Sequence, residues 1–361
     1  MRLAVLGAGA GGAAATVDLI ANGHRVRLWN RSPATLEPFR AAGGVCYEGQ
    51  LGAGVAEPEV ITADLSEAIE GAEAAVVCLP ALAHEGVASD LAATQATLPI
   101  LLNPGHTGGA LHFRSVFRAR RVPLPPLVEF STLTYVARKY QPDTVTVLGV
   151  SQRVHAGSLP GGGEALGLAR ELFSSACPAE DVLAVDLADV NLVLHPPGAL
   201  LGAAWVEATQ GDFFFYSQGV TPGVARVIGA LDAERLAVAA AFGHDLDPLH
   251  REMAAIGTAD PDSAARGDLA GAIRLGAANA EIRAPDSLAH RYYEEDFAYG
   301  LVPLLEFARI AGVDTPVALS LLTLGEALLD RNLRNEGLNA VRLGIEGLDR
   351  DALLNDVRGA L

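Results

Sequence analysis

Residues 2–22, RLAVLGAGAGGAAATVDLIAN, decide the fold of the first half of this chain. The apolar run Arg2 to Leu6 predicts a strand, glycines follow at once, and a helical pattern runs from Ala13 to Asn22. Gly23 ends that helix, and Arg25 to Trp29 predicts a second strand. A strand, a helix and a strand within about 30 residues form the βαβ unit of a parallel sheet.

The glycines of this stretch match the pattern G-x-G-x-x-G at Gly7, Gly9 and Gly12. The first glycine permits a tight turn, the second lets the backbone approach a pyrophosphate, and the third lets helix and strand pack closely. The helix N-terminus offers free N–H groups to the phosphates. A glycine-rich turn without a ligand is the alternative, but the strand before and the helix after favour a dinucleotide site, to which Ala10 and Gly11 also belong.

The end of the second predicted strand bears on the choice of cofactor. An NAD enzyme usually has Asp or Glu there to hold the ribose hydroxyls, whereas this chain has Asn30-Arg31-Ser32. These side chains can bind a 2′-phosphate, and arginine pairs well with phosphate oxygens. NADP(H) is therefore favoured over NAD(H). The alternative is that Arg31 only stacks on the adenine.

Two further strands end in turns that are expected to line the cofactor. Cys78-Leu79-Pro80 ends the apolar run that begins at Ala74, and Asn103-Pro104-Gly105 follows Pro99 to Leu102. Ligands of open α/β sheets bind at the carboxyl ends of the strands. We expect Leu79 and Pro80 to line the site and Asn103 to make a polar contact, although Cys78 and Pro80 could be packing residues.

The alternation of strands and helices stops near residue 181. Before it, strands are also expected at 126–130 and 144–150, and helices at 65–69, 82–97 and 163–174. Beyond it only long helical patterns remain, punctuated by prolines at 196–197, 222 and 261. A chain of 361 residues is also long for one core. We predict a Rossmann domain with a doubly wound parallel sheet over 1–181 and an all-α substrate domain over 182–361.

Composition excludes several classes of protein. The formal net charge is −17, and the only basic cluster is at 118–121, so no nucleic-acid partner is expected. Three widely spaced cysteines suggest neither a metal site nor a disulfide framework and favour the cytoplasm. The glycines interrupt what could otherwise resemble a signal peptide at Met1 to Ala15, and no apolar run is long enough to span a membrane.

A hydride-transfer enzyme needs a proton donor, and the predicted helical domain offers His195. Histidine titrates near neutral pH and suits proton transfer, although a lone histidine among apolar neighbours is often a hydrogen-bonded core residue. A second candidate stretch is 285–296, where Arg291 could bind a carboxylate and Asp296 could orient the imidazole. The alternative is an exposed, acidic helix start.

Longer motifs of the chain resemble the octopine/nopaline (opine) dehydrogenase family. They cover nearly the whole sequence, and those of the helical half are the specific ones. They are Glu129 to Arg138, Val190 to Pro197, Gly211 to Tyr216, Gly219 to Pro222, Leu231 to Leu236, Asp286 to Tyr292, Glu295-Asp296, and Tyr299 to Pro303.

The resemblance implies an enzyme that condenses an amino acid with an α-keto acid and reduces the imine with NAD(P)H. It implies that His195 transfers the proton, that Asp296 is its partner, and that Arg291 binds a substrate carboxylate. The imidazole is then expected to face the nicotinamide ring. Glu129 and Thr132 would contact substrate, and the chain departs from the pattern at Thr134, where some members are expected to have proline.

Two other functions fit the architecture. Glycerol-3-phosphate and β-hydroxyacid dehydrogenases use a lysine in the helical half, but the only lysine of this chain is Lys139. A non-catalytic NADP-binding sensor stays open, and it would be insensitive to loss of His195. The sequence identifies neither the amino acid nor the keto acid, and the apolar stretch Val317 to Leu329 could pack in the core or in a homodimer.

Overall fold

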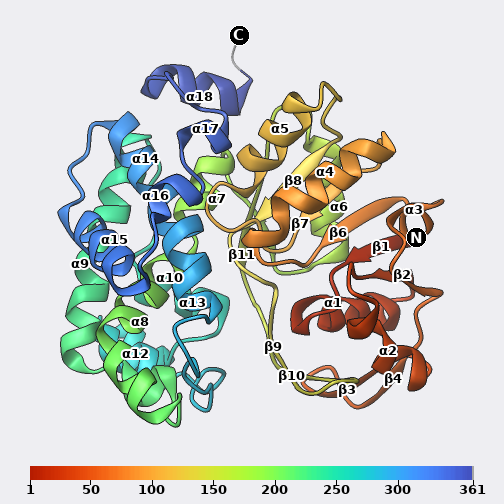
Figure 1. Ribbon diagram of the computed structural model, residues 1–361, viewed down its shortest axis with the longest axis horizontal. Coiled ribbons are helices and arrows are strands. Elements are labelled where there is room, and N and C mark those ends of the chain that lie inside the picture. The colour runs from red at the N-terminus through yellow and green to blue at the C-terminus, as the bar shows by residue number, and fades with distance from the viewer. Residues whose placement is uncertain (360–361) are drawn as a thin grey trace. The chain divides into compact units, whose positions relative to one another are not determined.

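The computed structural model describes residues 1–359 and divides into two compact units (Figure 1). The first unit comprises 1–105 and 113–179, and the second comprises 180 to the C-terminus together with the short segment 106–112. In the described residues no helix is both long and apolar enough to cross a membrane.

The first unit is built on an eight-stranded sheet. Its spatial order is β12-β11-β8-β7-β6-β1-β2-β5, and each adjacent pair is parallel except β8 with β11. This confirms the predicted Rossmann-type sheet, with one antiparallel pairing that the sequence did not indicate. The strands are β1 (Arg2–Leu6), β2 (Arg25–Trp29), β5 (Val60–Thr62), β6 (Ala74–Val77), β7 (Ile100–Leu102), β8 (Leu127–Phe130), β11 (Val154–Ser158) and β12 (Ala176–Pro178).

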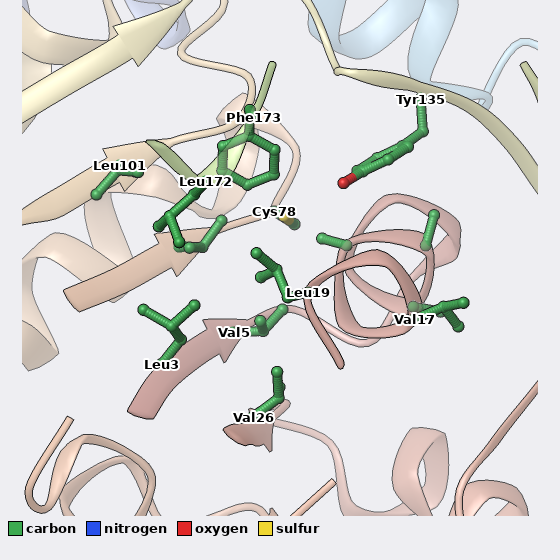
Figure 2. Packing of buried hydrophobic residues seen from close by; sticks show 14 of the residues in the cluster. Leu3, Val5, Val17, Leu19, Val26, Cys78, Leu101, Tyr135, Leu172 and Phe173 are labelled. Atoms are coloured by element: carbon green, nitrogen blue, oxygen red, sulfur yellow. The ribbon is translucent and has the colours of Figure 1, made fainter. Parts of the chain in front are cut away.

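Helices connect these strands, and the alanines and glycines of the first one allow it to pack closely on the sheet. The helices are α1 (Ala10–Ala21), α2 (Pro33–Ala41), α3 (Leu65–Ile69), the 3₁₀ turn η1 (Ala81–Ala83), α4 (His84–Thr94), α5 (Gly109–Ala119) and α6 (Gly163–Leu172). Figure 2 shows Leu19 of α1 against Val5 of β1, within a fully buried cluster that also contains Val26. This packing holds the glycine turn between β1 and α1.

A second, four-stranded sheet was only partly anticipated. Its order is β4-β3-β10-β9, with β3 (Val45–Gly49), β4 (Gly54–Ala56), β9 (Tyr135–Gln141) and β10 (Thr144–Val150). Only β10 was predicted, because the other strands are short or carry charged residues. Tyr135 of β9 donates a hydrogen bond to Asp18 of α1 over 2.6 Å, and the Lys139 ammonium lies 4.1 Å from the centre of the Phe39 ring.

The second unit is helical, as predicted. Its helices are α7 (Val182–Leu187), α8 (Val190–Thr209), the π-helical turn η2 (Phe215–Gly219), α9 (Pro222–Ala241), α10 (Leu249–Ile256), α11 (Pro261–Ala265), α12 (Leu269–Arg274), α13 (Arg291–Asp296), the π-helical turn η3 (Phe297–Leu301), α14 (Val302–Ala311), α15 (Pro316–Leu329), α16 (Leu333–Glu336), α17 (Ala340–Leu343) and α18 (Arg350–Arg358).

Prolines have two different roles in these helices. Pro222 and Pro261 begin α9 and α11, where a missing N–H costs nothing. Pro196 and Pro197 instead lie inside α8, which continues through them for another three turns. Because proline has no N–H, these two residues cannot donate to the preceding turn, which is the turn that carries His195.

A buried arginine ties several helices of the second unit together. Arg235 of α9 donates two hydrogen bonds to Asp232 of the same helix, at 2.8 and 2.6 Å, and others to the carbonyls of Leu187 and Asp247. The other oxygen of Asp232 accepts from the amide of Leu249, which begins α10. The motif at 231–236 therefore has a structural role.

Candidate functional site

The glycine turn of the first unit has the shape that a pyrophosphate requires. Gly7 has φ = 123°, and a β-carbon added there would lie 2.4 Å from the carbonyl oxygen of Cys78. A β-carbon on Gly12 would lie 1.8 Å from the carbonyl oxygen of Gly7, so a side chain fits at neither position. At Gly9, in contrast, no atom lies within 4 Å of an added β-carbon. The turn is therefore tightly packed at Gly7 and Gly12 and leaves open space at Gly9, where the phosphates would lie.

The N-terminus of α1 completes this cradle. Gly9 caps the helix and, as a glycine, has no side chain to accept a hydrogen bond from the first turn, which holds no acidic residue. A helix N-terminus of this kind favours a bound anion through its N–H groups and its dipole. Ala10 and Gly11 supply the first two residues of the helix, so the structure places all five predicted residues of the motif in one turn.

The end of β2 forms one wall of a cavity of about 180 Å³ next to this turn. Asn30 also supports the turn, because its Oδ1 accepts a hydrogen bond from the amide of Ala8 over 3.2 Å. The Arg31 guanidinium lies 3.9 Å from where a β-carbon of Gly86 would be, on the opposite wall. The lining combines the last residue of β2 and the three predicted residues after it with residues of the β6–α4 connection and of α4: Trp29, Asn30, Arg31, Ser32, Leu79, Pro80, Ala83, Gly86, Val87 and Asp90.

Asn103, the predicted cofactor contact at the end of β7, makes two hydrogen bonds to Thr134. The side chain is fully buried, and its Nδ2 donates to the hydroxyl of Thr134 over 2.9 Å. Its Oδ1 accepts from the backbone N–H of Thr134 over 3.1 Å, a bond that a proline at this position could not make. Asn103 therefore fixes the loop after β8, and the departure from the family pattern at Thr134 has a structural reason.

Glu129 and Thr132 lie at the end of β8 and just beyond it. The Glu129 side chain is fully buried against Gly105, where an added β-carbon would lie 2.3 Å from its Oε2. Thr132 is nearly buried. Both residues thus belong to the first unit, close to the loop that Asn103 holds.

In the second unit, two helices bring the predicted catalytic residues together. His195 lies on α8 and Asp296 at the end of α13, 101 residues later, with His195 Nδ1 3.0 Å from Asp296 Oδ2. The other ring nitrogen, Nε2, lies 2.9 Å from the hydroxyl of Tyr216 in η2. A histidine held between a carboxylate and a hydroxyl is equipped to take up and release a proton.

Aromatic rings hold the imidazole on two further sides. Tyr292 stacks on it with ring centres 3.9 Å apart and an angle of 22° between the planes, and Phe215 approaches edge-on at 6.1 Å. Tyr292 and Asp296 are four residues apart on α13, so they share the helix face that packs on α8. The hydroxyls of Tyr292 and Tyr216 lie 3.3 Å from each other.

The electrostatic surroundings of Asp296 are unusual. Burial raises the pKa of this carboxyl well above its ordinary value, and the adjacent Glu295 raises the pKa further. The charges of Arg291 and His106 act in the opposite direction. Glu295 lies 3.6 Å from the guanidinium of Arg291 and 3.2 Å from Nε2 of His106. Arg291 is half-exposed, with 51% of its side chain accessible, so it can pair with Glu295 and still bind a ligand.

The segment 106–112 adds groups that the sequence analysis missed. Thr107 donates to Asp189 over 3.2 Å, and the amide of Gly108 donates to Asp186 over 2.6 Å. Burial raises the pKa of Asp189, the N-cap of α8, to about 6. His106 and Tyr216 were also missed as site residues. Tyr216 stands in a quoted motif, but its spacing from His195 carries no signal because η2 is not a regular helix.

Comparisons with known proteins were made for the chain and for its structure. Residues 178–329 match a family described as NAD/NADP octopine/nopaline dehydrogenase, alpha-helical domain. Residues 2–101 match one described as NADP oxidoreductase, coenzyme F420-dependent. An opine dehydrogenase of Arthrobacter sp. (strain 1C) is 33% identical over 96% of this chain and 95% of its own.

Two kinds of solved structure share the fold. Octopine dehydrogenase, solved with NADH and L-arginine, superimposes with a TM-score of 0.75 at 22% identity, covering 99% of this chain and 98% of the other. Yersinopine dehydrogenase with NADP⁺ bound gives a TM-score of 0.67 at 16% identity, covering 99% and 97%.

Proposed function

The chain belongs to the octopine/nopaline (opine) dehydrogenase family, and on that basis we propose that it joins an amino acid to an α-keto acid and reduces the resulting imine. It is an NAD(P)-dependent oxidoreductase acting on CH–NH groups. The observation that carries the proposal is the His195–Asp296 pair, a positioned proton donor in the helical unit.

The reaction defines what the protein must provide. The free amine of the amino acid adds to the keto carbonyl, water leaves, and the imine carbon is reduced. In sum, amine, keto acid, NAD(P)H and one proton give a secondary amine, NAD(P)⁺ and water. The cofactor supplies the hydride, and the chain must supply binding, orientation and the proton.

His195 is the proton-transferring residue of this proposal. Loss of the carbonyl oxygen as water requires a proton, which the imidazolium can give at neutral pH. Asp296 at Nδ1 keeps the ring in one orientation and stabilises its charged form, as in other histidine–carboxylate pairs. The stacked ring of Tyr292 supports the same orientation.

Arg291 is the proposed carboxylate-binding group of the second unit. Its guanidinium can bind a carboxylate through two parallel hydrogen bonds, and both substrates carry one. Glu129 and Thr132 are the substrate-contacting residues that we propose in the first unit. The family resemblance is the basis for both assignments, and both residues lie at or just beyond the end of β8, before the Thr134 that Asn103 holds.

The glycine turn and the neighbouring cavity are the proposed cofactor site. The open space at Gly9 fits a pyrophosphate, and Arg31 on the cavity wall supports a preference for NADP(H) over NAD(H). Asn103 is also a proposed cofactor-binding residue, and its two hydrogen bonds to Thr134 fix its side chain.

Two further features stay proposals. The exposed side chains of Leu319 and Leu324 on α15 favour a homodimer through this helix, at the stretch 317–329. The free cysteines favour the cytoplasm, where thiols stay reduced.

The proposal is tested by following cofactor oxidation over a matrix of amino acids and keto acids, with pyruvate included and with NADH and NADPH each supplied. We expect turnover with at least one pair. His195→Asn should lower the turnover rate by about 100-fold or more and leave the dissociation constant of NADPH unchanged. Cofactor binding without oxidation by any pair would contradict the proposal and favour the sensor.

A further inference from the structure

The hydroxyl of Tyr216 contacts His195 Nε2, the ring nitrogen through which a proton must enter or leave. Asp296 takes Nδ1, Tyr292 covers a ring face, and the edge of the ring approaches Phe215. The Nε2 nitrogen points at the Tyr216 hydroxyl over 2.9 Å. A substrate oxygen cannot bind directly to Nε2 from this direction, because the Tyr216 hydroxyl already lies at hydrogen-bond distance there.

We propose that Tyr216 is the second proton-transferring residue of the site, and that its hydroxyl passes the proton between His195 Nε2 and the oxygen that leaves as water. This rests on the proposed function. As Nε2 gives its proton to the phenol oxygen, the phenol O–H gives its own proton to the departing oxygen. The O–H bond of the product water forms, the carbon–oxygen bond breaks, and tyrosine is neutral before and after.

The hydroxyl is able to reverse its role because it both donates and accepts. With neutral His195, whose Nδ1–H faces Asp296, the phenol O–H donates to Nε2. With imidazolium, Nε2–H donates to the phenol oxygen, and the phenol proton is directed onward. Tyr292, 3.3 Å from Tyr216, is a second hydroxyl that can hold the phenol oxygen during this exchange.

The local fold places Tyr216 for this task. It lies in η2, a π-helical turn that follows α8, and its ring is 5% exposed. Phe215 meets the Tyr216 ring edge-on at 5.0 Å, while Phe215 also contacts the Tyr292 ring at 4.9 Å. The phenol therefore has little freedom to turn away from the imidazole.

A matched pair of variants separates this role from the loss of any buried hydroxyl. Tyr216→Phe removes the proposed proton path and keeps the ring. Tyr293→Phe removes a hydroxyl from the same region, one whose hydrogen bond goes to the carbonyl of Ala199 on α8 over 3.0 Å. Both variants are checked for folding by circular dichroism and thermal unfolding.

We expect Tyr216→Phe to lower kcat by about 100-fold, within the range of general acid–base catalysis, and to change the pH profile and the solvent deuterium isotope effect on kcat. The dissociation constant of NADPH should not change. Tyr293→Phe should keep kcat within threefold and the wild-type pH profile. A Tyr216→Phe enzyme with kcat within threefold and an unaltered profile would overturn the proposal.

A second measurement does not depend on enzymatic activity. It therefore tests the role of Tyr216 independently of the proposed function. In ¹⁵N-histidine NMR of the protein, Tyr216→Phe should shift the Nε2 resonance and the titration midpoint of His195, whereas Tyr293→Phe should leave both unchanged. Identical spectra and midpoints in all three proteins would refute the contact at Nε2. Inactivity of the wild type with every substrate pair would instead refute the proposed function.

Discussion

Adding a methyl group at Gly12 should lower both stability and cofactor affinity, whereas adding one at Gly9 should lower cofactor affinity alone. At Gly12 the new β-carbon would lie 1.8 Å from the Gly7 carbonyl oxygen, more than 1 Å inside the closest distance that such atoms tolerate. Backbone must move, which costs about 1–3 kcal/mol or more. We expect Gly12→Ala to unfold at lower urea concentration and to bind cofactor poorly, because the turn itself is displaced.

Gly9→Ala should fold normally, since nothing lies within 4 Å of its added β-carbon and its φ of −72° suits any residue. A poorer helix cap and a less flexible unfolded chain offset each other to within about 1 kcal/mol. The methyl group would instead keep the pyrophosphate away from the backbone. Loss of one charged hydrogen bond, about 1.5–3 kcal/mol, corresponds to a roughly 10- to 100-fold higher Kd.

The assay is a fluorescence titration with NADPH alongside urea unfolding. Gly167→Ala is the matched control, because its methyl group also points into open space, on the exposed face of α6 in the same unit. It should leave the Kd unchanged and add about 0.5–1 kcal/mol of stability. The reasoning is refuted by a Gly9→Ala protein with wild-type affinity, or by a Gly12→Ala protein as stable as the wild type.

Three other variants test separate parts of the structure. Arg31→Gln should raise the Kd of NADPH about tenfold and that of NADH less than twofold, because only NADPH has a phosphate for the guanidinium; equal losses would contradict the preference. For Asp189, burial raises the pKa from 3.8 to about 6, so the folded wild type loses stability as pH rises through this window. The advantage of Asp189→Asn in urea midpoint should therefore widen between pH 4 and pH 6 and then stay constant; a gap independent of pH argues against this account. Arg235→Met leaves Asp232 buried without its partner and should cost about 3–5 kcal/mol of unfolding free energy, whereas a loss below 1 kcal/mol would show that the pair is dispensable.

The sequence predicts those parts of the fold that depend on local hydrophobic periodicity and glycine spacing. The glycine turn, the first two strands and the helix between them follow from spacing over residues 2–29 alone, and the helical character of the second half follows from hydrophobic periodicity. The second sheet was not predictable. Its strand β3 pairs in parallel with β10, about a hundred residues away, and no local pattern carries that pairing.

The candidate site likewise contains residues that the sequence identified and residues that it did not. His195 and Asp296 were proposed from the chemistry of their side chains, and the family resemblance implied their roles. Their 3.0 Å contact is consistent with this, but 101 residues separate them in sequence. Tyr216 and His106 could not be identified as their neighbours, because η2 and the segment 106–112 have no periodicity from which a direction can be inferred. Asn103 was expected to contact ligand, and only coordinates could reveal its two bonds to Thr134.

The solitary ammonium of Lys139, over the Phe39 ring, has a consequence for a protein exposed to keto acids. Such acids condense with uncharged primary amines, whereas guanidinium groups stay protonated and inert. Lysine contributes one of the 26 basic side chains, and arginine all the others. The chain therefore presents a single lysine ε-amine for adventitious Schiff-base formation with a keto acid. Its other basic side chains are arginines, which can bind the carboxylate of a keto acid without reacting with the carbonyl.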